Sequence, residues 1–251
     1  GMQAAIVLAE RGFRPILFER RAYLGGSAVL ASKAPCKGLV AEYIETQKNQ
    51  LAALGVQVEL NHAPTMAELR RLDPYGIFVT MGGQQIVPDI PGIDRENVFG
   101  IEDVLLGRRA IEGREVAVIG GGHVGLEVAH FLCANNKVTI VEMADEIGAS
   151  VYYITKFKLL PLLRGAGVTF RTGQAIAAVD DGSIRLRDTH TGQCTELKAE
   201  AVVLAMGSRP DLAARAAFDR NFDHVVYAGD AVRGGTMLEA NRDAFALAWE
   251  F

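Results

Sequence analysis

The chain has 251 residues, of which 49% are hydrophobic and 22% charged, and its net charge is −4. This composition predicts a soluble globular protein of one or two domains with an ample core. The absence of a basic cluster argues against nucleic-acid binding, and no apolar run approaches the roughly 20 residues of a membrane span. The apolar N-terminal segment has no basic flank, so it is not typical of a signal peptide.

The three cysteines, Cys36, Cys133 and Cys194, are scattered along the chain. They form neither a disulfide framework nor a C-x-x-C pair that could hold a metal or act in redox chemistry. This usage is typical of a reducing compartment, so we expect a cytoplasmic protein without metal ligands.

The first twenty residues predict a helix followed by a strand that ends in an acid, Glu19. They align with residues 125–143 so that Gly1 matches Gly125 and, with one residue of slack, Glu19 matches Glu142. Internal similarity of this kind indicates two nucleotide-binding domains. Counterparts of residues 116–124 would precede Gly1, so the alignment predicts a first domain that lacks its first strand and its first two glycines.

An α/β pattern continues after this first segment. We expect a helix, a strand, a short helix and a second strand over Ala41 to Leu54, Val56 to Leu60, Thr65 to Leu72 and Ile77 to Thr80. Thr65 is a plausible N-cap of the short helix. Pro88 and Pro91 then indicate an extended connector.

Residues 114–143 contain a complete strand, glycine turn, helix and second strand. Val116 to Ile119 is typical of a buried parallel strand, and Gly120, Gly122 and Gly125 have the G-x-G-x-x-G spacing. The first glycine permits a tight turn, the second lets a pyrophosphate approach bare backbone, and the third lets helix and strand pack closely. These features, in this order, predict a dinucleotide-binding unit.

The helix expected from Val124 to Cys133 would direct its free N–H groups and its positive end at the phosphates. Glu142 ends the second strand, where its carboxylate can accept the ribose hydroxyls. That carboxylate would repel a 2′-phosphate, and the next three residues include no arginine, so we expect NADH to be preferred over NADPH. We interpret His123 as a solvated loop residue whose backbone matters more than its ring.

The remaining elements keep the α/β pattern. We expect a helix from about Tyr153 to Leu163 and a last helix from Met237 to Trp249. Asp181-Gly182 is a hairpin turn signal. The expected strands are Val168 to Arg171, Ala175 to Val179, Ile184 to Arg187, Ala201 to Ala205 and Val225 to Ala228.

Several motifs are spread over nearly the whole chain: Leu24 to Gly26 with Ala31 to Pro35, Val79 to Gly83, Ile90 to Gly92, Gly120 to Glu127, Leu204 to Pro210 and Tyr227 to Asp230. Together they resemble the FAD and pyridine-nucleotide domains at the C-terminal end of the old yellow enzyme-like NADH:flavin oxidoreductases. That group includes 2,4-dienoyl-CoA reductase, 2-enoate reductase and trimethylamine dehydrogenase. The resemblance implies an α/β fold of two Rossmann-like domains, with a discontinuous FAD domain (residues 1–106 and 208–251) and an NAD(H) domain (residues 107–207).

The resemblance also implies roles for single residues. Glu19 would hold the adenosine ribose of FAD, Gly25 and Gly26 would approach its pyrophosphate, and the backbone of Val58 would meet its adenine. Asp230 would hydrogen-bond the ribityl or pyrophosphate part. The remaining expected cofactor-binding positions are Gly1, Gly82, His123, Val124, Glu127, Gly207 and Met237.

Met237, Glu127 and the residue before Gly82, Met81, differ in what the resemblance implies for them. The helix that begins near Met237 would aim its N-terminus at the flavin carbonyl. Glu127 would lie near the meeting point of the two rings, or it is an ordinary helix acid, and both interpretations stay open. Met81 departs from the Ala-Thr-Gly that is usual in the family at this place, which puts the contact with FAD there in doubt.

The implied function is electron input: a hydride passes from NADH to FAD, and electrons continue to an FMN-bearing barrel and a [4Fe-4S] centre N-terminal to this chain. No residue here would bind the organic substrate, and we predict no catalytic side chain. The expected partner is that barrel, and homo-oligomerisation is left open. Because the front of the first domain is missing, we expect the chain alone to carry no FAD.

Other functions were weighed against this one. In an amine dehydrogenase or demethylase of the same group, the second domain would bind a nucleotide structurally. A disulfide reductase is disfavoured because the segment after Gly26 has no cysteine pair. A ferredoxin- or monooxygenase-coupled reductase stays open on fold alone.

Overall fold

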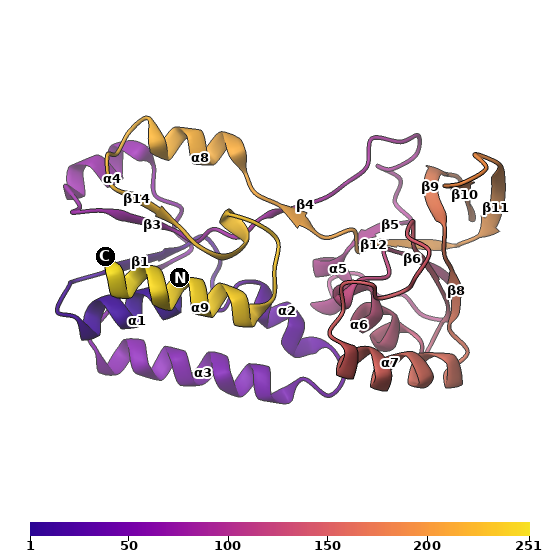
Figure 1. The fold of residues 1–251 in the computed structure, drawn as a ribbon, viewed down its shortest axis with the longest axis horizontal. Coiled ribbons are helices and arrows are strands. Elements are labelled where there is room, and N and C mark those ends of the chain that lie inside the picture. The colour runs from indigo at the N-terminus through magenta and orange to yellow at the C-terminus, as the bar shows by residue number, and fades with distance from the viewer. The chain divides into compact units, whose positions relative to one another are not determined.

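The computed structural model describes residues 1–251, which form two compact units (Figure 1). Unit 1 contains residues 1–32, 38–84 and 208–251, and unit 2 contains residues 33–37 and 85–207. Residues 85–106 therefore belong to unit 2, whereas we expected the first domain to extend to residue 106. The reason is β5 (Val98–Gly100), which pairs in parallel with β12 (Ala201–Leu204) and so joins the sheet of unit 2.

Unit 2 is built on a five-stranded parallel sheet in the order β5-β12-β6-β7-β8. The other strands are β6 (Glu115–Ile119), β7 (Lys137–Val141) and β8 (Thr169–Arg171). All four residues of β12 and the last four of β6 are buried. Such continuous apolar strands are typical of a parallel sheet that is covered on both faces.

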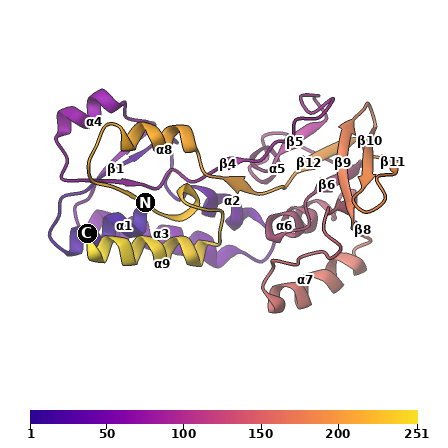
Figure 2. The ribbon, with the colours of Figure 1, turned by 45° about the horizontal axis from the view of Figure 1, so that its top comes forward.

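One face of this sheet carries helices and the other an antiparallel sheet (Figures 1 and 2). The helices are α5 (Ile101–Leu105), α6 (His123–Leu132) and α7 (Tyr153–Gly165). The antiparallel strands are β9 (Gln174–Val179), β10 (Ser183–Asp188) and β11 (Cys194–Lys198), and Gly182, with φ +80°, lies in the turn between the first two. Ile184 and Leu186 of β10 are completely buried against the parallel sheet.

Unit 1 holds two separate pairs of parallel strands. β1 (Ile16–Glu19) pairs with β2 (Gln57–Leu60), and β3 (Ile77–Val79) pairs with β14 (Val225–Tyr227). The two pairs are not joined into one sheet. The expected α/β fold is confirmed.

The helices of unit 1 surround α1 (Met2–Glu10), which packs against α3 (Gly38–Ala53) and α9 (Met237–Glu250). The expected N-cap is correct, because Thr65 accepts a hydrogen bond from the backbone of Glu68 at the start of α4 (Met66–Leu72). The remaining elements of this part of the fold are α2 (Ser27–Lys33), β4 (Gln84–Gln85), β13 (Ser208–Arg209), α8 (Leu212–Asp219) and the 3₁₀ helix η1 (Gly229–Ala231).

Eight elements were not expected from the sequence: α2, α5, α8, η1, β4, β5, β11 and β13. None has more than eight residues, so each is too short for a repeating pattern of apolar residues to be recognised with ease. A signal for α8 was present, because Asp211 caps it by accepting a hydrogen bond from the N–H of Ala214 at 2.9 Å. No helix in the chain combines the length and apolar character needed to cross a membrane.

The close packing of α6 on β6 yields a first prediction. A Cβ atom added at Gly125 would overlap the carbonyl oxygen of Gly120, which is backbone and cannot swing away. We expect Gly125→Ala to lower the free energy of unfolding by about 1–3 kcal/mol, the usual cost of overpacking. Urea denaturation measures this difference.

Gly165→Ala is the matched control, because no atom lies within 4 Å of a Cβ at the end of α7. This variant should be as stable as the wild type or slightly more stable. Equal stability of the two variants would show that α6 does not need to approach β6 so closely.

Candidate nucleotide-binding site

The glycine turn of unit 2 leaves bare backbone exposed at the start of a helix. Gly120 has φ +109°, and a Cβ there would overlap the carbonyl oxygen of Ala205, so only glycine fits. α6 then begins at His123 with Gly122 as its N-cap, and no side chain caps the helix. Nothing lies within 4 Å of a Cβ position at Gly122. Bare backbone at the positive end of α6 therefore faces open space.

Glu142 follows β7 and is held against this turn. Its Oε2 accepts a hydrogen bond from the N–H of Gly121 at 2.7 Å, and its Oε1 accepts one from the N–H of Ala144 at 2.9 Å. A carboxylate offers about four lone-pair sites, so both oxygens keep room for a ribose hydroxyl. The structure thus brings together Gly120, Gly122 and Glu142 as the sequence predicts.

Unit 1 repeats part of this arrangement. The Oε1 atom of Glu19 accepts a hydrogen bond from the N–H of Arg21 at 2.9 Å, the same two-residue relation as between Glu142 and Ala144. Val58 lies on the neighbouring strand, opposite Leu17. Gly1 is the N-cap of α1, and a Cβ there would lie 2.9 Å from Oγ1 of Thr80. Glu19, Val58 and Gly1 therefore lie on elements that are adjacent or in contact.

The other expected glycines have backbone conformations that suit close approach. Gly25, Gly26, Gly82 and Gly207 have φ values of +113°, +52°, +76° and +84°. A Cβ at Gly25 would lie 2.9 Å from Val29, whereas nothing lies within 4 Å of such an atom at the other three. Side chains are disfavoured at all four positions by the left-handed conformation.

Asp230 lies in η1 and is partly satisfied by its own unit. Its Oδ1 accepts a hydrogen bond from the N–H of Gly235 at 3.2 Å, and its Oδ2 lies 3.5 Å from the hydroxyl of Ser208. The carboxylate keeps acceptor capacity for a ligand hydroxyl.

The N-terminus of α9 differs from the expectation of an open positive end near Met237. A capping box closes it: Glu239 donates its N–H to Thr236 Oγ1 at 3.2 Å, and the N–H of Thr236 donates to Glu239 Oε2 at 2.7 Å. The N–H and the hydroxyl of Thr236 both donate to the Glu239 carboxylate, and these two hydrogen bonds lower its pKa. The start of α9 therefore carries a carboxylate, that of Glu239, and two of its backbone N–H groups are already satisfied within the chain.

Glu127 and His123 form a cluster with Lys37. Glu127 is 8% exposed, and its Oε1 lies 2.7 Å from Lys37 Nζ and 2.8 Å from His123 Nε2. Burial is the largest single effect on the Glu127 carboxyl and opposes its ionisation, but the hydrogen bonds and charges of His123 and Lys37 together lower its pKa. His123 is thus the first residue of α6 and not a loop residue, and its ring, which is 40% exposed, is bound to Glu127.

The sequence did not reveal the role of Lys37. This residue follows Pro35-Cys36 in a segment without periodicity, and its partner is ninety positions further along the chain. Glu127 is therefore a buried, doubly paired carboxylate and not a solvated helix acid.

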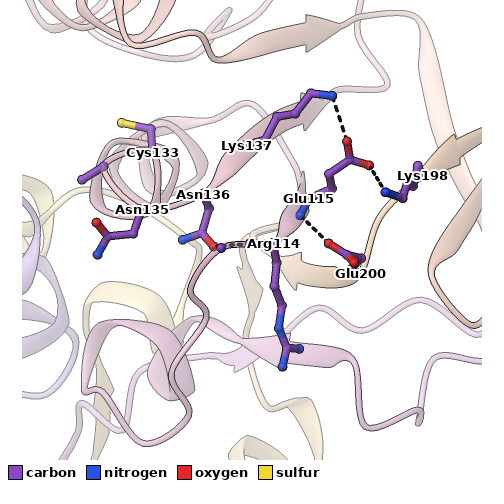
Figure 3. A pocket seen from close by; sticks show the side chains of 10 residues that line it. Arg114, Glu115, Cys133, Asn135, Asn136, Lys137, Lys198 and Glu200 are labelled. Carbon is purple, nitrogen blue, oxygen red and sulfur yellow. Dashed lines mark hydrogen bonds and ion pairs between the residues drawn. The ribbon is translucent and has the colours of Figure 1, made fainter.

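A separate hollow of about 550 Å³ lies at the amino ends of β6 and β7 (Figure 3). Its charges pair with one another, since Lys137 and Lys198 lie 2.8 and 3.3 Å from the carboxylate of Glu115. Glu200 accepts a hydrogen bond from the N–H of Glu115 at 2.9 Å. Nucleotides bind at the carboxyl ends of parallel strands, so this hollow is not part of the candidate site.

The cysteines and the metal-ligating residue types form no site of their own. Cys36, Cys133 and Cys194 are all free thiols. No group of three or more His, Cys, Asp or Glu side chains comes together to hold a metal ion.

The Lys37–Glu127–His123 cluster yields a prediction on pH. Since the folded pKa of Glu127 is lowered, its stabilisation is fully present above the unfolded pKa of about 4.3 and is lost as pH falls through the folded pKa. We expect Glu127→Gln to reduce the free energy of unfolding by about 1–3 kcal/mol at pH 7. The difference from the wild type should shrink below about pH 4.3.

Glu146→Gln is the control, because Glu146 pairs with Lys156 at an exposed position and such pairs contribute little. Urea denaturation at several pH values measures both variants. A Glu127→Gln effect that stays constant from pH 7 to pH 3 would contradict the lowered pKa.

Comparison with known proteins places the chain among flavin oxidoreductases. Residues 1–224 match the sequence model of the family described as pyridine nucleotide-disulphide oxidoreductase. The NADH oxidase of Thermoanaerobacter brockii is 32% identical over the whole chain, which covers 39% of that protein. The cinnamate reductase of Clostridium sporogenes is 29% identical, with 99% of this chain and 37% of that protein covered.

A solved structure agrees with these relatives. The structure of a 2-naphthoyl-CoA reductase in complex with 2-naphthoyl-CoA has a TM-score of 0.91 and 25% identity, and the match covers all of this chain and 38% of that protein. The chain thus spans about two fifths of the proteins that it matches. The resemblance to the old yellow enzyme-like group is confirmed, and the chain belongs to the pyridine nucleotide-disulphide oxidoreductase family.

Proposed function

We propose that this chain is the electron-input module of a larger flavin oxidoreductase, and that it passes a hydride from NADH to FAD. In this proposal unit 2 binds NAD(H) and unit 1 binds FAD. The observation that carries it is the complete unit of β6, glycine turn, α6, β7 and Glu142, with open space beside Gly122. A second domain that held a nucleotide only structurally would not need this intact turn.

The residues present fit a dinucleotide in unit 2. The pyrophosphate would lie against Gly120 and Gly122, at the N–H groups of His123 and Val124, which begin α6. The ribose hydroxyls would donate to Glu142, whose carboxylate is already oriented by two backbone N–H groups. A Cβ atom would clash with backbone at Gly120 and Gly125, whereas the Cβ position of Gly122 is open. Both observations support this placement.

The residues of unit 1 suit FAD in part. Glu19 would accept from its adenosine ribose, Val58 would meet the adenine, Gly25 and Gly26 would pass beside the pyrophosphate, and Asp230 would accept from the ribityl chain. FAD supplies an acceptor that takes two electrons as a hydride and can release them singly. In unit 1 no strand joins the β1–β2 pair to the β3–β14 pair, so these residues do not share one continuous sheet.

The longer relatives support a place for this module in a larger protein. We infer that electrons leave FAD towards an FMN barrel and a [4Fe-4S] centre in the remainder of the full-length protein. The names of the relatives agree with this direction of flow, because one is an NADH oxidase and others reduce cinnamate and 2-naphthoyl-CoA. The three free thiols are in keeping with a cytoplasmic setting.

The choice of nicotinamide cofactor tests the proposal. We expect the wild-type chain to bind NADH more tightly than NADPH, because Glu142 repels a 2′-phosphate. Glu142→Ala should weaken NADH binding by about 1–3 kcal/mol, the contribution of hydrogen bonds to a charged group. NADPH binding should change less or improve. Isothermal titration calorimetry with both nucleotides measures this.

Glu196→Ala is the control, because Glu196 lies exposed on β11. This variant should bind both nucleotides as the wild type does. Tighter binding of NADPH than of NADH by the wild type would contradict the role given to Glu142.

A further inference from the structure

The outer face of α9 carries an apolar stripe that the chain leaves exposed. The stripe consists of Leu238, Phe245 and Trp249, with an exposed arginine, Arg242, between them. The exposed fractions of the three apolar residues are 67%, 49% and 59% in that order. The rings of Phe245 and Trp249 stack on each other, with their centroids 5.9 Å apart. Figure 1 shows α9 in yellow, in front of α1.

The fold of unit 1 does not need these large side chains on the outside. A surface helix normally buries its large apolar residues and presents polar ones to solvent. In α9 the small residues Ala244 and Ala248 face inward, where they are buried in one cluster with residues of α1. Exposed aromatic residues and arginine together are typical of an interaction surface.

The spacing of the stripe matches the seam of a coiled coil. Its four positions follow one another at intervals of four, three and four residues. This is the alternation of d and a positions, which keeps the side chains on one line and lets a second helix pack between them. Ala246 lies exposed beside this line, and its small side chain permits a close approach. The stripe is therefore shaped for another helix.

The charge of Arg242 selects the direction of that helix. Two parallel copies of α9 would place Arg242 against Arg242 of the second copy, which is repulsive. In an antiparallel pair a and d positions face each other. Arg242 then faces Phe245 of the second copy, and Leu238 faces Trp249. A guanidinium group over an aromatic ring is favourable, so α9 is complementary to itself in the antiparallel direction.

We propose that α9 is a self-association surface, on which a second copy of this chain packs its own α9 antiparallel about a twofold axis. The same stripe is then used on both copies, as in a closed symmetric dimer. The inference goes beyond the proposed function and does not rest on it, because no nucleotide takes part.

The size of the stripe sets the strength of the dimer. A fully buried aromatic side chain removes about 150–250 Å² from water, and Phe245 and Trp249 are already about half covered. The stripe therefore offers each copy less than the roughly 800 Å² of a standard interface. The dimer is weak and forms in a concentration-dependent way.

Trp249 provides a direct readout, because it is the only tryptophan in the chain. The wild-type chain is studied by sedimentation velocity and by fluorescence from about 1 µM to about 1 mM. We expect the sedimentation coefficient to rise towards that of a dimer. The emission of Trp249 should move to shorter wavelength over the same range, because the indole leaves water as the dimer forms.

Leu238→Lys tests the stripe without removing the fluorophore. This change places a second cation beside Arg242 and against the apolar indole, so we expect the dimer to weaken about tenfold or more. Leu238 is largely exposed, so the variant should keep the urea transition of the wild-type monomer. Phe157→Lys is the matched control, because Phe157 is 80% exposed on α7, outside the stripe. It should dimerise as the wild type does.

Each outcome decides the inference. Loss of the dimer and of the emission shift in Leu238→Lys alone supports it. A wild-type chain that stays monomeric with constant emission overturns it, and the stripe is then left to solvent or to another part of a longer protein. A dimer that survives Leu238→Lys, or that Phe157→Lys abolishes, also overturns it. None of these results bears on the binding of NADH, so the proposed function stands or falls separately.

Discussion

The contact between the start of α6 and the end of β6 determines what unit 2 can bind. Gly125 lies against the carbonyl oxygen of Gly120, and Gly120 lies against that of Ala205, so neither position tolerates a side chain. Because the helix sits this close to the sheet, its uncapped N-terminus and the open backbone at Gly122 face the place where β7 ends. Glu142 then has a fixed position relative to the turn, since the N–H of Gly121 binds its carboxylate.

The two units share the arrangement of an acid that follows a parallel strand, and the sheet around this acid is continuous only in unit 2. Glu19 and Glu142 each follow a parallel strand and each accept a hydrogen bond from the N–H two residues later. In unit 2 a continuous five-stranded sheet supports this acid, whereas in unit 1 the strands form two separate pairs. The buried Glu127, held by Lys37 and His123, adds a charged cluster on the same helix that would bind the phosphates. α6 therefore combines an uncapped N-terminus with a buried, paired carboxylate one turn further along the helix.

Local patterns in the sequence predicted the parts of the fold that depend on local physics. The glycine spacing, the buried strand from Val116 and the cap at Thr65 were all predicted, because each follows from a few neighbouring residues. Contacts between distant segments were not predicted. β5 has only three residues and joins its sheet by pairing with β12, which moved the boundary of unit 2 from residue 107 to residue 85. Lys37 meets Glu127 only after the chain has folded.

The central claim is that the full-length protein containing this chain accepts a hydride from NADH on FAD. Anaerobic mixing with NADH, followed by the flavin absorbance, tests it most directly. The account predicts rapid bleaching in the wild type and greatly slowed bleaching in Gly122→Ala, which should fold normally because its new methyl group meets no protein atom within 4 Å but occupies the space left for the pyrophosphate. No bleaching of the wild type by NADH, or equal rates in the two proteins, would contradict the account.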